Sequence, residues 1–71
     1  MYYLIEITTY ADDTKDSYAV YPQESLDAAS AAFHGKMAGA IRSENYASEL
    51  CMIIDGRGAV QRYEFWERQS A

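Results

Sequence analysis

The sequence predicts an α+β fold, in which a four-stranded, mostly antiparallel sheet carries one helix on a face, in the element order ββαββ. Three observations lead to this prediction. Residues 2–10 and 46–55 are rich in β-branched and aromatic side chains, residues 26–42 place apolar side chains at helical spacing, and an Asp-Gly turn signal precedes the last strand. The 71 residues form a single domain, residues 1–71.

The first two strands are predicted as a hairpin. Residues 2–10 alternate apolar and polar side chains and contain several β-branched and aromatic residues. Two aspartates within residues 11–15 favour a turn. Residues 17–21 form a short aromatic segment that Pro22 ends, which is typical of an edge strand antiparallel to the first.

The helix is predicted over residues 26–42. Ser25 is the N-cap, because its hydroxyl can accept a hydrogen bond from a free backbone N–H, and Asp27 adds negative charge at the positive end of the helix dipole. Arg42 lies near the last carbonyls, and residues 43–45 mark the exit. The apolar stripe that should lie on the sheet consists of Leu26, Ala29, Ser30, Phe33, Met37, Ala40 and Ile41.

Residues 46–55 are predicted as a central strand, because the run 50–54 is apolar at every position and therefore suits cover on both faces. Asp55 to Gly58 is a hairpin signal, since the glycines allow positive φ, and residues 59–66 return as the last strand. One 17-residue helix covers a single face of the sheet. The other face then needs a cover.

The helix has no polar side, and this is the main prediction about assembly. The face opposite the apolar stripe consists of Ala28, Ala31, Ala32, Gly35, Ala38 and Gly39. A solvated helix would carry charged side chains there. Each glycine costs about 1 kcal/mol relative to alanine inside a helix, a cost that close approach of another backbone would offset. We therefore expect a homo-oligomer with this face as its interface; the alternative is a weak, alanine-rich surface helix.

Charge and composition exclude several classes of protein. The net charge is −5, and all of the excess lies in the first 35 residues, where six acids accompany Lys15 alone. Duplex nucleic acid is not an expected partner, since its binding needs a basic face. No segment approaches membrane-spanning length, and the start of the chain lacks a signal-peptide pattern, so we expect a cytoplasmic protein. The single cysteine, Cys51, is expected to be a buried thiol.

Candidate ligand-binding residues are few. A flank histidine can hydrogen-bond a ligand, a lysine or arginine can pair with a phosphate, and a tryptophan can stack on a base. The residues in question are His34, Lys36, Arg57, Arg62 and Trp66, and Arg68 is a further possible anion contact. The alternative interpretation of His34 and Lys36 is a boundary histidine and a lysine that reaches to solvent. No catalytic set, metal site or cofactor is predicted, because one histidine and one cysteine cannot hold zinc within one chain.

Three segments carry a resemblance to a known group of proteins. They are residues 2–9 (YYLIEITT), residues 26–40 (LDAASAAFHGKMAGA) and residues 50–66 (LCMIIDGRGAVQRYEFW). The chain resembles small proteins of Firmicutes phages and integrative mobile elements, in which such a strand, an Ala-rich helix with an aromatic-His pair and a hydrophobic strand with a D-x-x-G turn recur in this order. Phe33 and His34 match the pair. The resemblance implies a mobile-element context, in which small acidic proteins often bind host factors.

Two functional hypotheses follow. The first is a homo-oligomeric, non-catalytic counter-defence protein that sequesters a nucleotide signal between subunits or binds a host defence protein. The second is an acidic structural or regulatory interaction module without a small ligand, whose first half docks on a basic surface. An enzyme is not expected, since no activated nucleophile or carboxylate pair can be assembled from the sequence.

Overall fold

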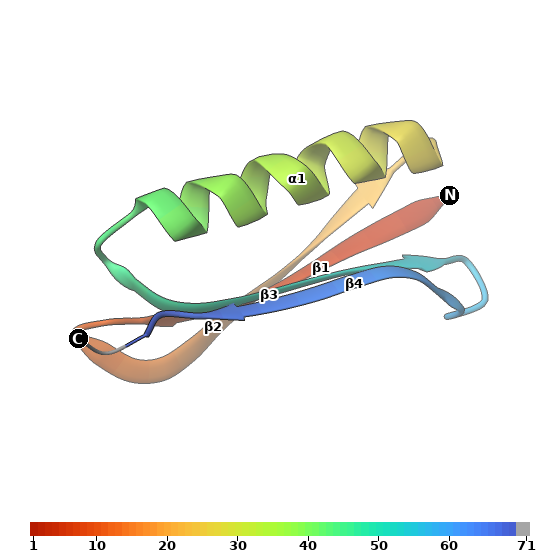
Figure 1. Ribbon diagram of the computed structural model, residues 1–71. Coiled ribbons are helices and arrows are strands. Elements are labelled where there is room, and N and C mark those ends of the chain that lie inside the picture. Colours follow the sequence, from red (N-terminus) through yellow and green to blue (C-terminus); the bar gives the residue numbers. More distant parts are fainter. Residues whose placement is uncertain (70–71) are drawn as a thin grey trace.

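The computed structural model describes residues 1–69, apart from the side chains of residues 13 and 14. The elements are β1 (Tyr2–Tyr10), β2 (Asp13–Gln23), α1 (Leu26–Arg42), β3 (Tyr46–Asp55) and β4 (Val60–Glu67). The strands form one sheet in the order β2-β1-β3-β4 with antiparallel neighbours throughout, so that β1 and β3 are central. Figure 1 shows α1 lying along one face of this sheet. The predicted α+β fold is confirmed.

The first hairpin is longer than predicted. β2 runs from Asp13 to Gln23 instead of 17–21, and the turn consists of Ala11 and Asp12. The strand extends because the ladder with β1 continues to Gln23, with a shift of register between Thr9 and Tyr10 that absorbs extra residues of β2. Pro22 lies within the strand, which is possible because β2 is an edge strand.

The ends of α1 are as predicted. Ser25 Oγ accepts a hydrogen bond of 3.0 Å from the backbone N–H of Ala28, and Asp27 lies in the first turn. The backbone N–H of Ser43 closes the helix by donating to the carbonyls of Gly39 and Ala40. In the described part of the chain, no helix has the length and apolar character that crossing a membrane requires.

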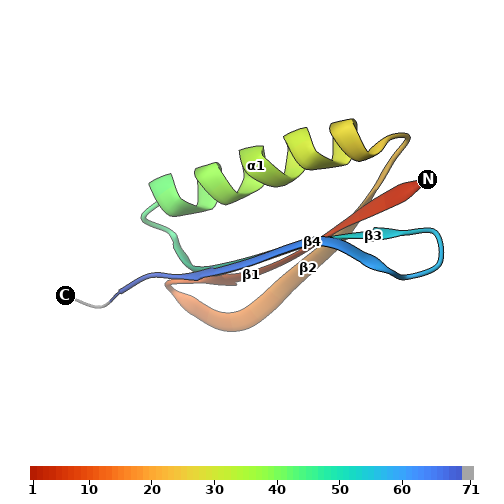
Figure 2. The same ribbon diagram turned by 45° about the vertical axis from the view of Figure 1, so that its right-hand side comes forward.

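The core is a single layer between α1 and the central strands. Its buried side chains are Leu4, Ala29, Phe33, Met37, Cys51 and Ile53, with Tyr2, Tyr21, Ala32 and Trp66 packed around them. The prediction was wrong for the two ends of the stripe, because Leu26 and Ile41 are exposed. Leu26 lies in the first turn, at the end of the helix, and Ile41 lies on its flank. Figures 1 and 2 show that no described element lies on the opposite face of the sheet.

Candidate functional site

The largest candidate site is the sheet face opposite α1, which we call the open face. Alternate residues of a strand point to opposite faces, and paired residues share a face. Three cross-strand rows therefore make up the open face: Tyr18, Ile7, Leu50 and Phe65; Val20, Ile5, Met52 and Tyr63; and Pro22, Tyr3, Ile54 and Val60. None of these twelve side chains carries a charge.

The open face is exposed in the single chain. Tyr18 is 81% exposed, Tyr63 58% and Phe65 50%. The central side chains, such as Met52, are half-buried by their neighbours within the sheet. Monomeric soluble proteins rarely expose a contiguous apolar patch larger than a few hundred Å² unless it is a site of interaction. The open face is therefore the part of the molecule that most needs a cover.

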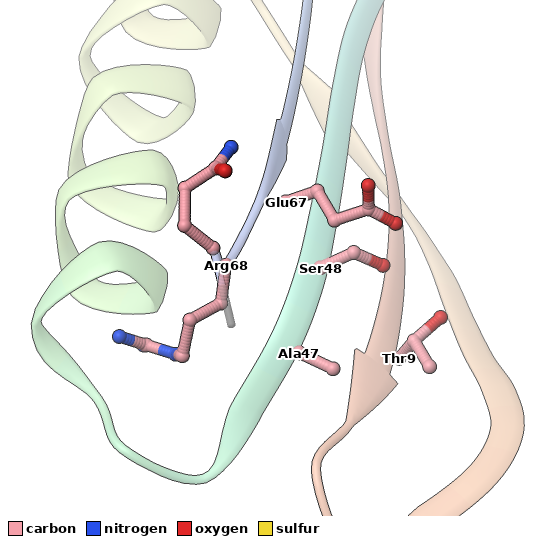
Figure 3. A pocket seen from close by; sticks show the side chains of 6 residues that line it. Thr9, Ala47, Ser48, Glu67 and Arg68 are labelled. Atoms are coloured by element: carbon pink, nitrogen blue, oxygen red, sulfur yellow. The ribbon is translucent and has the colours of Figure 1, made fainter. Parts of the chain in front are cut away.

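A polar row borders one end of the open face. It consists of Asp16, Thr9, Ser48 and Glu67, one residue from each strand. Thr9 Oγ1 donates a hydrogen bond of 2.6 Å to Asp16 Oδ1. Figure 3 shows the side chains of Thr9, Ser48 and Glu67 beside an open hollow that Ala47 and Arg68 also line. The apolar rows thus end at an acidic border.

The β3–β4 turn closes the opposite end of the open face. Asp55 Oδ1 accepts hydrogen bonds from the backbone N–H groups of Arg57 at 2.8 Å and Ala59 at 3.0 Å. The N–H of Gly58 donates to the carbonyl of Asp55 at 3.0 Å, and Gly58 has a φ of 88°, which suits glycine. The predicted hairpin turn is confirmed, and it fixes Arg57 at this end of the sheet.

Two of the predicted ligand residues meet on the flank of α1 that faces β4. His34 is exposed, and its Nε2 lies 3.4 Å from a guanidinium nitrogen of Arg62. The Arg62 guanidinium lies 5.7 Å from the centre of the Phe33 ring. Two groups that can carry positive charge are thereby brought together at the surface.

The other three predicted ligand residues lie elsewhere. Lys36 is on the opposite flank, where its Nζ is 3.3 Å from Glu6 Oε1 and 4.0 Å from the centre of the Tyr21 ring. Trp66 is half-buried against the core, and Arg57 lies in the distant turn. A single chain therefore does not assemble the five residues into one pocket.

The predicted helix interface is open to solvent in the single chain. Ala28, Ala31, Gly35 and Gly39 are exposed, and a Cβ added at either glycine would have nothing within 4 Å. Ala32 differs from this prediction, because it is half-buried and packs against the core. Ala32 lies one helical turn before Lys36, whose Nζ lies over the Tyr21 ring of β2, so the two share the flank of α1 that faces β2.

A buried acidic cluster lies between the sheet and α1, and the sequence analysis did not find it. Glu49 has no exposed surface. Thr8 Oγ1 donates a hydrogen bond of 2.5 Å to its Oε1, and Cys51 Sγ lies 3.7 Å from its Oε2. The signal was the alternation along β3, which places Glu49 on the same face as Cys51 and Ile53.

The pKa values of the two carboxyl groups in this cluster, Glu49 and Glu6, are shifted in opposite directions. Burial raises the pKa of Glu49 to about 7, and its hydrogen bond with Glu6 acts in the same direction. Burial also acts to raise the pKa of Glu6, but the hydrogen bond with Glu49 and the charge of Lys36 outweigh it, so that this pKa lies below its usual value. Glu49 therefore keeps its proton to a higher pH than Glu6 does. Because Glu49 is closed to solvent, the effect of its raised pKa is on the stability of the fold, which should depend on pH.

Arg68, which directly follows β4, is anchored by its guanidinium group. Its Nε donates to the carbonyl of Tyr46 at 3.0 Å. A terminal nitrogen of the same guanidinium donates to the carbonyls of Ile41 and Ser43 at the end of α1. The guanidinium is therefore engaged with backbone carbonyls, where the sequence had offered it as an anion contact.

Fold and site together define a small α+β protein with one covered and one uncovered sheet face. No protein family, curated protein or solved structure matches this chain.

Proposed function

We propose that this protein works without catalysis, as a small interaction protein whose docking surface is the open face. The observation that carries the proposal is the set of three uncharged rows, whose outer side chains Tyr18, Tyr63 and Phe65 are at least half exposed. Covering apolar surface is favourable by roughly 25 cal/mol per Å². A small domain with a core on one side of its sheet gains stability from a partner on the other side.

The shape of this surface favours a macromolecular partner. Small-molecule sites are concave and enclose most of their ligand, whereas the open face is one side of a sheet. Its aromatic side chains supply large contact areas at low entropic cost, as at the centres of protein interfaces. An interaction module is also favoured over an enzyme, because the two carboxyl groups with shifted pKa values, Glu6 and Glu49, lie on the α1 side of the sheet and away from this surface.

Hydroxyl-radical footprinting in cells that express the protein tests this proposal for any partner. We expect much weaker labelling of Tyr18, Tyr63 and Phe65 than side chains with their exposed fractions in the single chain would show. Leu26 and Ile41 are exposed on the side of α1 and serve as internal controls that should be labelled normally. Labelling of the open face in proportion to its exposure, in cells, would contradict the proposal.

A second candidate function is the sequestration of a nucleotide signal, as expected of a cytoplasmic counter-defence protein from a phage or mobile element. The juxtaposition of His34 and Arg62 favours it, since a phosphate can accept hydrogen bonds from both side chains. Calorimetry with a panel of cyclic and linear nucleotides tests it. Binding that Arg62→Ala abolishes would support this function, and the absence of heat with every nucleotide would exclude it for the panel.

A further inference from the structure

We propose that the occupant of the open face is a second copy of this chain, packed sheet against sheet, with β4 of one protomer over β4 of its partner. This inference rests on the proposed function and names the partner. Sheets that pack face to face lie about 10 Å apart with interlocking side chains. The interface is then the second half of a β-sandwich core, with a helix on each outer side.

The open face is large enough for a dimer interface. Its three apolar rows, the polar row and the β3–β4 turn occupy five steps of about 6.7 Å along four strands that lie about 4.8 Å apart, which gives a footprint of roughly 640 Å². A standard stable interface buries about 800 Å² of accessible surface per partner, and the accessible surface of protruding side chains exceeds their footprint. Two copies related by a twofold axis use the same patch twice, which makes a uniformly apolar surface complementary to itself.

The charge distribution favours a copy over a charged partner. The three apolar rows offer no ionic partner to a basic or acidic surface, and such a surface would lose hydration without compensation. A second copy presents uncharged rows to uncharged rows and keeps its charges at the border.

The positions of charged residues along the strands favour one of two possible orientations of the twofold axis between the protomers. An axis that runs across the strands, through the row of Met52 and Tyr63, reverses the strand direction between the two sheets. Glu67 lies four residues beyond Tyr63, and the β3–β4 turn begins four residues beyond Met52, so both are about 13 Å from the axis. This arrangement places Arg57 of each protomer near the partner's Glu67, which gives two ion pairs.

The other twofold arrangement is disfavoured by like charges. An axis parallel to the strands would place β2 over β4 and bring Asp16 of each protomer over the partner's Glu67. At the other end, Arg57 would face the region after β2, where Glu24 is the nearest acid. Figure 2 shows that this connection rises toward α1, away from the open face. Repulsion would thus remain without a compensating pair.

A charge-exchange experiment on purified protein tests the arrangement. The dimer dissociation constant is measured by analytical ultracentrifugation for the wild type, Arg57→Glu, Glu67→Arg and the double variant. Each single reversal should weaken the dimer roughly tenfold, because it replaces two attractions with two repulsions. The double variant should return to within about threefold of the wild type. Glu64→Arg, on the α1 side of β4, is the matched control and should change little.

The possible outcomes separate this inference from the proposed function. A wild-type dimer that neither Arg57→Glu nor Glu67→Arg weakens would overturn the β4-on-β4 arrangement. A wild-type protein that stays monomeric would overturn the second copy as the occupant, while protection of the open face in cells would still support a different protein partner. Arg57 and Glu67 are exposed, so circular dichroism should show unchanged folding for the variants at these two positions. Rescue by the double variant would establish the inferred pair.

Discussion

The hydroxyl of Thr8 in β1 donates a hydrogen bond of 2.5 Å to Oε1 of Glu49 in β3, in the closed space between the sheet and α1. Burial raises the pKa of Glu49 to about 7 from the ordinary value of 4.5. A carboxyl group with a higher pKa in the folded state binds its proton more tightly there. Its stabilising effect is complete below pH 4.5 and is lost as the pH rises through about 7.

The first prediction concerns stability against pH. The free energy of unfolding of the wild type should decrease between pH 5 and pH 8, by about 2 to 3 kcal/mol if about 1.4 kcal/mol accompanies each unit of pKa shift. Glu49→Gln keeps an uncharged side chain that can still accept from Thr8, and its stability should be nearly flat over this range. Urea unfolding at several pH values measures both. Glu64→Gln, at an exposed position, is the control, and an equal slope in Glu49→Gln and wild type would refute the assignment.

The second prediction concerns Cys51. Burial raises the pKa of its thiol to about 12, and the negative charge of Glu49 acts in the same direction. Iodoacetamide at pH 8 should therefore label the folded protein very slowly and the protein in guanidinium chloride rapidly, as followed by mass spectrometry. Rapid labelling under native conditions would contradict the burial of the Cys51 thiol.

The third prediction concerns Arg68, whose guanidinium joins the end of β4 to the end of α1. Arg68→Ala should lower the free energy of unfolding by about 2 to 3 kcal/mol, because hydrogen bonds from a charged donor contribute about 1.5 to 3 kcal/mol. Arg42→Ala is the matched control, since Arg42 is exposed in the last turn of α1 and should cost less than about 1 kcal/mol. Equal losses in the two variants, measured by urea unfolding, would show that the contacts of Arg68 add nothing.

The fourth prediction distinguishes the helix surface from the open face. Gly39→Ala should stabilise the protein by about 1 kcal/mol, because an added Cβ has nothing within 4 Å. In a domain of this size that gain raises Tm by about 4 to 8 °C. Size-exclusion chromatography should show an unchanged assembly. If Gly39→Ala instead dissociates the protein, the interface lies on the small-residue face of α1, as the sequence first indicated.

Much of the fold could be predicted because its signals are local. The bounds of β1, α1 and β3 follow from periodicity, and Ser25 supplies the N-cap contact that its sequence position predicts. The length of β2 could not be predicted in this way, because it depends on pairing with β1 through an irregular register. The anchoring of Arg68 could not be predicted for a related reason, since its partners at the end of α1 lie more than 20 residues earlier in the chain.

The candidate site could be predicted in part. The apolar run at residues 50–54 correctly indicated that the sheet has a second face to cover, because alternation sends Leu50, Met52 and Ile54 away from α1. The sequence also predicts an interface on the small-residue face of α1, and this stays a prediction. The open face combines residues from all four strands, so it can be recognised only when the pairing register of the strands is known. Within one chain the candidate ligand residues do not converge, because Lys36 and His34 lie on opposite flanks of α1.

The central claim is that a second copy covers the open face, and the molar mass in solution tests it most directly. Size-exclusion chromatography with light scattering should give twice the 8.0 kDa chain mass for the wild type at micromolar concentration. Met52→Glu, which places a charge at the centre of the open face, should give a single chain mass, and Ala31→Glu on α1 should remain dimeric. A wild-type protein with the mass of one chain at every concentration, unchanged by Met52→Glu, would contradict the claim.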